Sequence, residues 1–281
     1  MAKNDCDQNV NGVELGFVEE SESFCLRSKQ FHSKVGGRPA WLSQSGLPSP
    51  SELCCLKCGQ PSAFLLQVYA PIPRQARSFH RTCFVFCCKN TACYSHNDSR
   101  CFKGVVGVSL LDHKFLFLEY EVVTEPEELQ LEADSDGQIE EEQLKESEPP
   151  ASDVLESMDE KDLEAMAKHE SKESKVFEKF KRRTAIEPEQ VLRYCRMGRP
   201  LWVSDENVPK ETDIPNCLCG AKRLFEFQIM PQLLNYLKVD SPDASIDWGT
   251  LVVYTCAESC DQGNKYTAEF ILKQDYGADH I

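Results

Sequence analysis

Eight of the fifteen cysteines form four close pairs, an arrangement that suits tetrahedral zinc. Two pairs from separate turns can supply four thiolates while joining segments that are distant in the chain. The spacing predicts two such sites. The expected ligands are Cys55, Cys58, Cys88 and Cys93 in the first site, and Cys217, Cys219, Cys256 and Cys260 in the second. Zinc with four thiolate ligands has no open position for water or substrate, so we expect both ions to be structural.

The choice of ligand is open at one position. Cys54 and Cys55 are adjacent, and Cys55 is preferred because it leaves the usual two-residue gap before Cys58. In the second site Cys217 and Cys219 are separated by one residue, which is tighter than an ordinary zinc knuckle. Two other interpretations compete with zinc: buried free thiols, and redox chemistry at the first cysteine pair. The redox interpretation is weaker because a loop and a strand, not a helix, are expected after that pair.

A motif of the first half recurs in the second half at a constant distance. The equivalent residues, each pair 161 positions apart, are Gly37 and Gly198, Arg38 and Arg199, Pro39 and Pro200, Trp41 and Trp202, Cys58 and Cys219, Gly59 and Gly220, Phe64 and Phe225, and Gln67 and Gln228. Independent changes in loop length would not preserve one separation, so the pattern indicates an internal duplication. The repeat also favours Cys88 over Cys87 as a ligand, because Cys87 aligns with Thr255.

The repeated residues outside the cysteines are expected to have structural roles. A glycine after the second cysteine allows a tight turn that aims backbone amides at the thiolates. Trp41 and Trp202 are interpreted as core anchors, with a peptide-binding groove as the alternative. Gln67 and Gln228 are expected to hydrogen-bond to backbone inside the fold.

A third metal site is a weaker hypothesis. His80, His96 and His113 lie near the first cysteine cluster, together with Cys93 and Cys101. Their spacing is irregular, which favours surface or packed histidines.

The pattern of apolar residues predicts a β-rich α+β protein. Two duplicated units, each closed by one zinc ion, are expected to pack together, with a helical segment beside them and an acidic disordered insertion. The expected parts are an N-terminal zinc-binding β unit at residues 13–123, the acidic linker at 124–151, the helical segment at 152–194 and a C-terminal zinc-binding β unit at 195–276.

Individual elements follow from the periodicity of apolar residues. Strands are expected at 13–18, 64–69, 82–87, 224–229, 250–255 and 266–272, with further edge strands at 105–108 and 115–118. Helical stripes are expected around Leu155 to Met166 and Val176 to Phe180, a short helix from Pro188 to Tyr194, and a helical turn within Met230 to Leu237.

The net charge of −15 arises in one part of the chain. Residues 119–173 contain 21 acidic residues and four lysines, so this segment carries −17 and the remainder carries +2. Proteins that bind nucleic acid directly neutralise phosphates with Lys and Arg, and this balance argues against that class. It favours a basic protein partner.

Several other classes are disfavoured by what the sequence lacks. No nucleotide-binding glycine loop, serine nucleophile elbow or pair of catalytic carboxylates occurs in a convincing context, so we expect no enzyme activity. No apolar run approaches the roughly 20 residues of a membrane span, and the N-terminal residues do not resemble a signal peptide. We therefore expect a soluble protein with metal-bound and buried thiols. The basic run Lys179-Phe180-Lys181-Arg182-Arg183 resembles a nuclear signal, although solvation of a helix end explains it better.

Specific motifs in both halves resemble the programmed cell death protein 2 family. They are the run Lys34 to Leu42, the run Phe64 to Pro71, Phe79-His80-Arg81, the helical stretch Met166 to Glu170, Ile246-Asp247-Trp248-Gly249 and Cys256-Ala257-Glu258-Ser259-Cys260. Members of this family usually carry a MYND zinc finger before the acidic segment. This chain resembles a form without it, because Cys101-Phe102-Lys103 passes to Leu111-Asp112-His113 without a run of finger ligands.

The resemblance implies a function in small ribosomal subunit biogenesis. It implies a dedicated chaperone or adaptor that captures one basic small-subunit ribosomal protein, in the cytoplasm and nucleus, by strand addition or groove contact together with charge. The acidic segment agrees with a basic client. The alternative is a nuclear regulatory adaptor in transcription, cell proliferation or programmed cell death, and a thiol redox enzyme is a third class.

Overall fold

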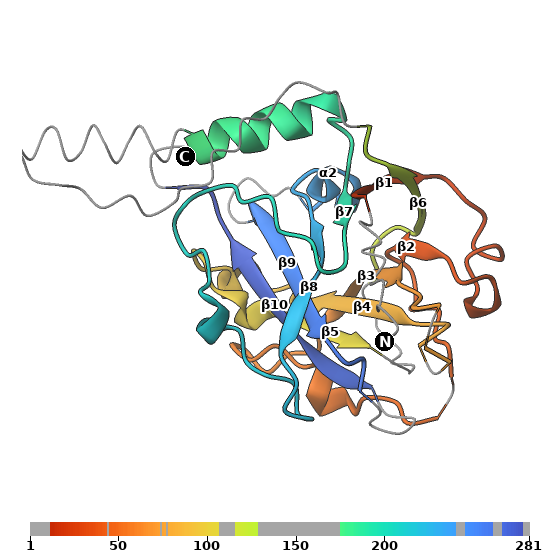
Figure 1. Cartoon of the computed structure of the whole chain (residues 1–281). Helices are drawn as coiled ribbons and strands as arrows, with labels where there is room; N and C mark the ends of the chain where they lie inside the picture. Colours follow the sequence, from red (N-terminus) through yellow and green to blue (C-terminus); the bar gives the residue numbers. More distant parts are fainter. Residues whose placement is uncertain are drawn as a thin grey trace, which may run out of the picture.

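Ten antiparallel strands form one closed barrel (Figure 1). The structure is a computed structural model, and it describes residues 12–43, 45–73, 75–76, 78–106, 116–128, 175–239, 245–260 and 266–277. The strands are β1 (Glu14–Glu19), β2 (Ser33–Val35), β3 (Ala63–Tyr69), β4 (Thr82–Cys87), β5 (Phe102–Val106), β6 (Tyr120–Pro126), β7 (Leu192–Tyr194), β8 (Arg223–Ile229), β9 (Thr250–Cys256) and β10 (Thr267–Gln274). Around the barrel their order is β1-β6-β2-β3-β4-β5-β10-β9-β8-β7, and β7 pairs with β1 to close it.

The two halves of the chain contain the same bulged hairpin. In the β3–β4 pair the register shifts between Phe64 and Leu66, and in the β8–β9 pair it shifts between Phe225 and Phe227, the equivalent residues of the repeat. A bulge adds one residue to one strand and increases the local twist. The extra residues are Leu65 in the first half and Glu226 in the second.

The sequence analysis predicted two duplicated units packed together. The structure instead joins the strands of both halves in one barrel. β5 pairs with β4 of the first half and β10 of the second, and β1 pairs with β7 at the other junction. Closure satisfies the hydrogen-bonding edges that two open sheets would leave exposed. The stretch predicted as an edge strand near Val105 is therefore an internal strand of the barrel.

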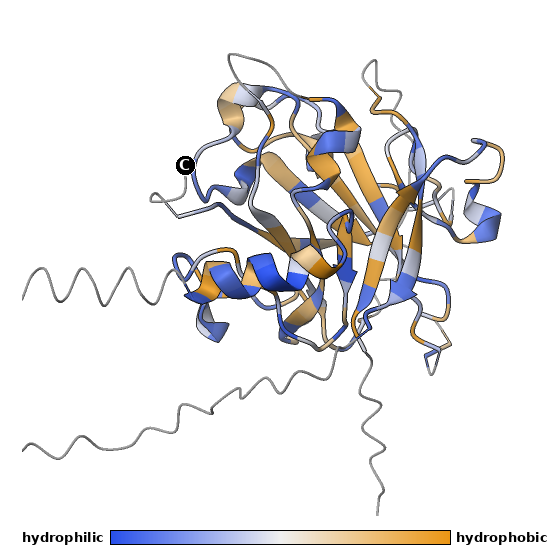
Figure 2. Ribbon diagram, turned by 90° about the horizontal axis from the view of Figure 1, so that it is seen from above, coloured by the Kyte–Doolittle hydropathy of each residue, from blue (hydrophilic) through white to orange (hydrophobic). Residues whose placement is uncertain are grey.

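The main core lies inside the barrel. One connected cluster of buried side chains draws on strands of both halves, including Val35, Val85, Phe227 and Val253. These residues alternate with outward-facing ones, as period-two strands require, and the orange of apolar residues predominates in the strands of Figure 2. Fully burying a side chain of this size contributes about 1.5–3 kcal/mol.

Most predicted strands are confirmed, and two local predictions are wrong. The stretch from Pro188 to Tyr194 is not a short helix: its last three residues form β7, because there they pair with β1 and β8. Residues 116–118 are not a strand, since β6 begins at Tyr120. β6 extends to Pro126, so the predicted linker begins with three strand residues. The rest of that linker from residue 129, and the predicted helical stripe from Leu155 to Met166, lie outside the described residues.

The helices are short and peripheral. A helix described over residues 175–186 packs Phe177 and Phe180 against Val203, Met230 and Tyr276, which confirms the predicted stripe there. The predicted helical turn is α2 (Leu233–Leu237), and the 3-10 helices are η1 (Ser28–Gln30), η2 (Pro50–Leu53), η3 (Thr91–Cys93), η4 (Ser99–Cys101) and η5 (Glu211–Asp213). Within the described ranges, none of the helices has the length and apolar character needed to cross a membrane.

Candidate metal centres

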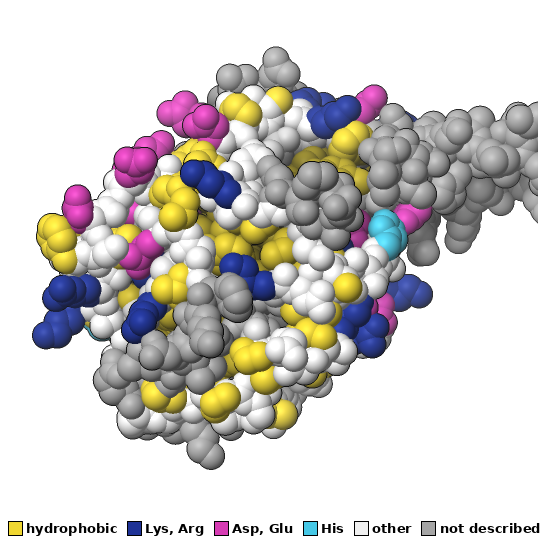
Figure 3. All heavy atoms as spheres, turned by 180° about the vertical axis from the view of Figure 1, so that it is seen from behind, with side chains coloured by type: hydrophobic (Ala, Val, Ile, Leu, Met, Phe, Trp, Pro, Cys, Tyr) yellow, Lys and Arg dark blue, Asp and Glu magenta, His cyan; other side chains and the backbone are white. Residues whose placement is uncertain are grey.

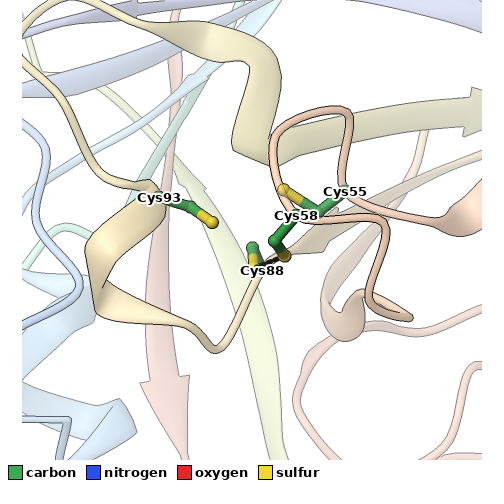
Figure 4. Close-up of side chains that lie close together, drawn as sticks. All are labelled: Cys55, Cys58, Cys88 and Cys93. Carbon is green, nitrogen blue, oxygen red and sulfur yellow. Dashed lines mark hydrogen bonds between the residues drawn. The ribbon is translucent and has the colours of Figure 1, made fainter.

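The first four predicted ligands come together beside the end of the β3–β4 hairpin. Cys55 and Cys58 lie in the loop after η2, Cys88 directly follows β4, and Cys93 ends η3. Their sulfur atoms all lie within 4.8 Å of one another, and the close-up shows two loops converging on one point (Figure 4). Within the described part of the chain, only two such groups occur, and the other consists of Cys217, Cys219, Cys256 and Cys260.

The sulfur separations fit a four-coordinate metal. Zn–S bonds of about 2.3 Å place the sulfurs of a tetrahedral site about 3.8 Å apart. The Sγ–Sγ distances are 3.6 Å for Cys58 and Cys88, 3.5 Å for Cys217 and Cys260, and 3.7 Å for Cys219 and Cys256. A disulfide bond would need about 2.05 Å. The donor sets therefore suit a thiophilic ion, and all four sulfurs of each group are available to it.

Backbone amides point at the sulfurs in the way that zinc knuckles require. The N–H of Lys57 lies 3.4 Å from Cys55 Sγ, and the N–H of Asn90 lies 3.3 Å from Cys88 Sγ. In each case the donor is two residues after the cysteine. The turns depend on Gly59 and Gly220, whose φ angles of 70° and 89° are left-handed, so the predicted role of these glycines is confirmed.

The thiols of the first group differ in acidity. The N–H of Gln60 lowers the pKa of Cys58 to about 7. Burial raises the pKa of Cys93 to about 11, and burial also raises the pKa of Cys88. Four thiolates in one place would repel one another without a cation, whereas a coordinated metal deprotonates its thiol ligands. The four thiols of the first quartet would therefore all be ionised only with a cation bound between them.

The second group has a shorter spacing between its first two cysteines than the first group, and its cysteines are more exposed. Cys217 and Cys219 lie on one turn with Leu218 between them, and Leu218 is 84% exposed. Burial raises the pKa of Cys217, while the N–H of Ala221 lowers the pKa of Cys219. The one-residue gap between the two cysteines therefore still brings both sulfurs to one centre.

Arg196 supports the loop that carries the last two cysteines. Its guanidinium donates to the backbone carbonyl of Ala257 at 3.1 Å and to the Thr255 hydroxyl at 3.1 Å. The same group donates to Glu226 Oε2 at 2.5 Å, which neutralises its charge. The second thiolate group is thereby connected to the interior of the barrel.

Glu226 is the centre of a buried polar network that joins the two halves. Its carboxylate is fully buried and accepts two hydrogen bonds from Arg81, at 2.8 and 3.1 Å, from across the barrel. Tyr194 and Thr255 donate to it as well, at 2.9 and 2.5 Å. Burial raises the pKa of Glu226, but the two arginines outweigh that effect, and its pKa lies below the ordinary value.

Sequence reasoning missed this network, although one signal was present. Glu226 interrupts the apolar run Leu224-Phe225-Glu226-Phe227, and its equivalent in the first half is Leu65. A carboxylate at a position that the repeat fills with leucine predicts a buried partner for it.

The other residues that the sequence offered as metal ligands do not join either quartet in the described part of the chain. Cys54 is not part of the quartet, since its thiol donates to the carbonyl of Pro50 at 3.2 Å. His80 stacks on Phe31 and forms a hydrogen bond with Tyr69, and His96 Nδ1 lies 3.7 Å from Asp275 Oδ2. Neither histidine belongs to one of the two cysteine groups. His113 lies outside the described residues.

The predicted roles of the repeated tryptophan and glutamine are confirmed with one difference. Gln67 accepts a hydrogen bond from the N–H of Ala40 at 2.8 Å, and Gln228 accepts one from Leu201 at 2.6 Å, the equivalent residue. Trp41 is 4% exposed and packs on Phe84. Trp202 is half-buried, so the outer face of the second half is covered less completely.

Comparison with known proteins gives consistent results over both halves. Models of the N-terminal and C-terminal domains of programmed cell death protein 2 match residues 12–117 and 174–275. Programmed cell death protein 2 of Bos taurus is 42% identical over 344 aligned positions, covering 95% of this chain and 98% of the relative. The Rattus norvegicus protein is 43% identical over 338 positions, covering 94% and 96%. These alignments are longer than the chain of 281 residues, so the relatives contain insertions relative to it.

A more distant match has a different name. The probable 20S rRNA accumulation protein 4 of Schizosaccharomyces pombe is 32% identical over 109 residues, covering 35% of this chain and 26% of that protein. No solved structure matches the chain.

Proposed function

This chain belongs to the programmed cell death protein 2 family, and from that premise we propose that it is a non-enzymatic chaperone or adaptor for a basic small-subunit ribosomal protein. The observation that supports the proposal is the match to a relative named for 20S rRNA accumulation, a name that points to ribosome biogenesis. The acidic segment at residues 119–173, with 21 acidic residues and four lysines, supports a basic client. We expect the protein to act in the cytoplasm and nucleus, where such a client is made and assembled.

The metal centres are proposed to be two structural zinc ions. Each quartet would use all four coordination positions for cysteine, which leaves none for substrate or water. Zinc would hold the loops at both hairpins in place, and no reaction step is assigned to it. The repeated bulge and the repeated Gln contacts support our inference that the two halves arose by duplication.

A closed barrel changes the expected mode of binding. Each described strand already has two neighbours, which argues against strand addition to the barrel. Contact with the outer surface, strengthened by charge, is the proposed mode.

The relatives' names supply a second candidate. They refer to programmed cell death, which favours a regulatory adaptor in that process. The two candidates predict different partners.

Affinity purification of the tagged full-length protein tests the proposal. We expect one small-subunit ribosomal protein in a stoichiometric amount, and depletion of the protein should lower free small subunits relative to large ones. A matched variant with Cys58→Ala and Cys219→Ala should lose both bound metal and client. Recovery of chromatin or cell-death factors with normal subunit ratios would instead support the second candidate.

A further inference from the structure

Partners of this protein must bind the outer surface of the barrel or its loops, since the described strands have no free edge. Large apolar side chains are exposed at several places on the described part of the chain. Three of them are Phe24 (62% exposed) in the connection between β1 and β2, Phe79 (49%) in the connection between β3 and β4, and Leu118 (51%) just before β6.

A hollow of about 480 Å³ opens between the β1–β2 connection and the start of β6. We call it the β6 hollow and define it by Glu20, Glu22, Leu118, Glu119 and Tyr120. It combines carboxylates with apolar surface. Acidic side chains gather along the upper left edge of Figure 3, on the side where β6 and the β1–β2 connection lie.

The charge available in the β6 hollow comes from two residues. Glu119 forms an ion pair with the buried Lys34, so its charge is already balanced. Glu20 and Glu22 are exposed and face the same hollow. Two carboxylates beside the exposed Leu118 and the half-buried Tyr120 would suit a side chain with a cationic end and an apolar stem.

An aromatic cluster of Phe31, Tyr69, Phe79 and His80 continues this surface. Phe31 and His80 stack with ring centroids 3.9 Å apart, and Phe79 meets His80 edge-on at 4.9 Å. The backbone of Phe31 adopts the left-handed conformation, with φ at 57°. This conformation commonly ends a helix, and Phe31 is the C-cap of η1, with its N–H bonded to the carbonyl of Ser28.

The aromatic cluster and the β6 hollow are connected through β2 and β6. His32, next to Phe31, places its Nδ1 atom 2.5 Å from Glu121 Oε1, and Glu119 of the hollow pairs with Lys34. Lys34 and Glu121 are register partners in the same strand pair. One continuous surface therefore offers carboxylates at one end and stacked rings at the other.

We propose that this surface is the docking site for an extended arginine-bearing segment of the basic client. The inference rests on the proposed function and adds the binding surface and the side chain that it selects. A guanidinium can form paired hydrogen bonds with a carboxylate and also stack on an aromatic face, whereas the ammonium of lysine is a compact, strongly hydrated charge. The surface offers both kinds of contact within one segment's reach.

Fluorescence polarisation with the full chain tests the site. The probe is a labelled peptide of alternating arginine and serine, compared with versions in which lysine or glutamate replaces arginine. We expect the arginine peptide to bind most tightly and the glutamate peptide not to bind. The paired change Glu20→Gln with Glu22→Gln should weaken arginine-peptide binding about tenfold, as expected for two surface charge pairs. Phe79→Ala should weaken the arginine peptide more than the lysine peptide.

Asp205→Asn with Glu206→Gln provides the matched control. Both residues are exposed acids of the second half, and this variant changes the net charge equally. It should bind the arginine peptide like the original chain. Unchanged melting temperatures would show that all variants are folded. Equal losses in both double variants would mean that only total charge matters and would overturn the site, as would tighter binding of an RNA oligonucleotide than of the peptide.

The site and the proposed function fail in different ways. If the triple variant Glu20→Gln, Glu22→Gln, Phe79→Ala still captures the ribosomal protein as the original chain does, the docking site is wrong and the function stands. If the original chain captures no ribosomal protein, the proposed function is wrong, whatever the peptide binding shows.

Discussion

Replacing Glu226 with glutamine should destabilise the barrel by about 3–5 kcal/mol, because it removes the carboxylate that balances the guanidinium groups of Arg81 and Arg196. Glu226 is fully buried, Arg81 is 6% exposed, and Arg196 is 12% exposed at its side chain. Water therefore cannot replace the lost carboxylate. The loss would be a large fraction of the roughly 5–15 kcal/mol by which a domain is stable.

The contacts of the carboxylate give the same magnitude. Its two oxygens accept hydrogen bonds from Arg81, Arg196, Tyr194 and Thr255. Glutamine keeps one accepting oxygen. If its N–H₂ group takes the place of Oε1, it faces two other donors, the Arg81 guanidinium and the Tyr194 hydroxyl. Losing charge-assisted hydrogen bonds costs about 1.5–3 kcal/mol each, so two such losses account for the expected range.

Urea unfolding followed by circular dichroism measures this difference. Glu211→Gln is the matched control, since Glu211 pairs with Lys222 at the surface, where both side chains are more than 70% exposed. That change should leave the unfolding midpoint almost unchanged, because solvent screens the pair. Adding Arg81→Met to the Glu226→Gln variant should cost less than the sum of the two single changes. Equal midpoints for Glu226→Gln and Glu211→Gln would refute the reasoning.

The same carboxylate predicts how stability depends on pH. The pKa of Glu226 in the folded protein is lowered, so the unfolded state binds its proton more readily. The stabilisation is complete above the unfolded value of about 4.3 and is lost as pH falls through the folded value. The Glu226→Gln variant should lack this contribution to acid unfolding.

Cys260→Ala should reduce the metal count from two to one in native mass spectrometry and lower the melting temperature, and retention of two ions would contradict a four-thiolate site. Gly59→Ala should cost about 1–2 kcal/mol, because an added Cβ has free space and only the left-handed backbone is strained. Gly36→Ala should cost more in the same denaturation assay, because its Cβ would lie 1.9 Å from the carbonyl oxygen of Leu118, and equal costs would refute this steric argument. Gln228→Leu should cost about 1–3 kcal/mol by leaving the Leu201 N–H without its acceptor, measurable as faster hydrogen exchange at that amide.

Local patterns predicted the local structure well. The cysteine spacing identified two quartets that the structure brings together. The usual two-residue gap before Cys58 favoured Cys55 over Cys54, and Cys55 is the one that lies in the first quartet. Alternation of apolar residues located most of the strands. Where these predictions were wrong, pairing partners distant in the sequence determined the outcome, as in β7, whose three residues are a strand only because β1 and β8 flank them.

The closure of the barrel was not predictable from the repeat, because a repeat describes only what the two halves share. The Gln67 and Gln228 contacts could be inferred by comparing the halves, since each contact lies within one half. Contacts between the halves join residues that are not equivalent: Arg81 meets Glu226, and the counterpart of Glu226 is Leu65. The most informative positions for joining two similar halves are therefore those where the repeat breaks and a charged residue replaces an apolar one, because burial obliges that residue to find a partner outside its own half.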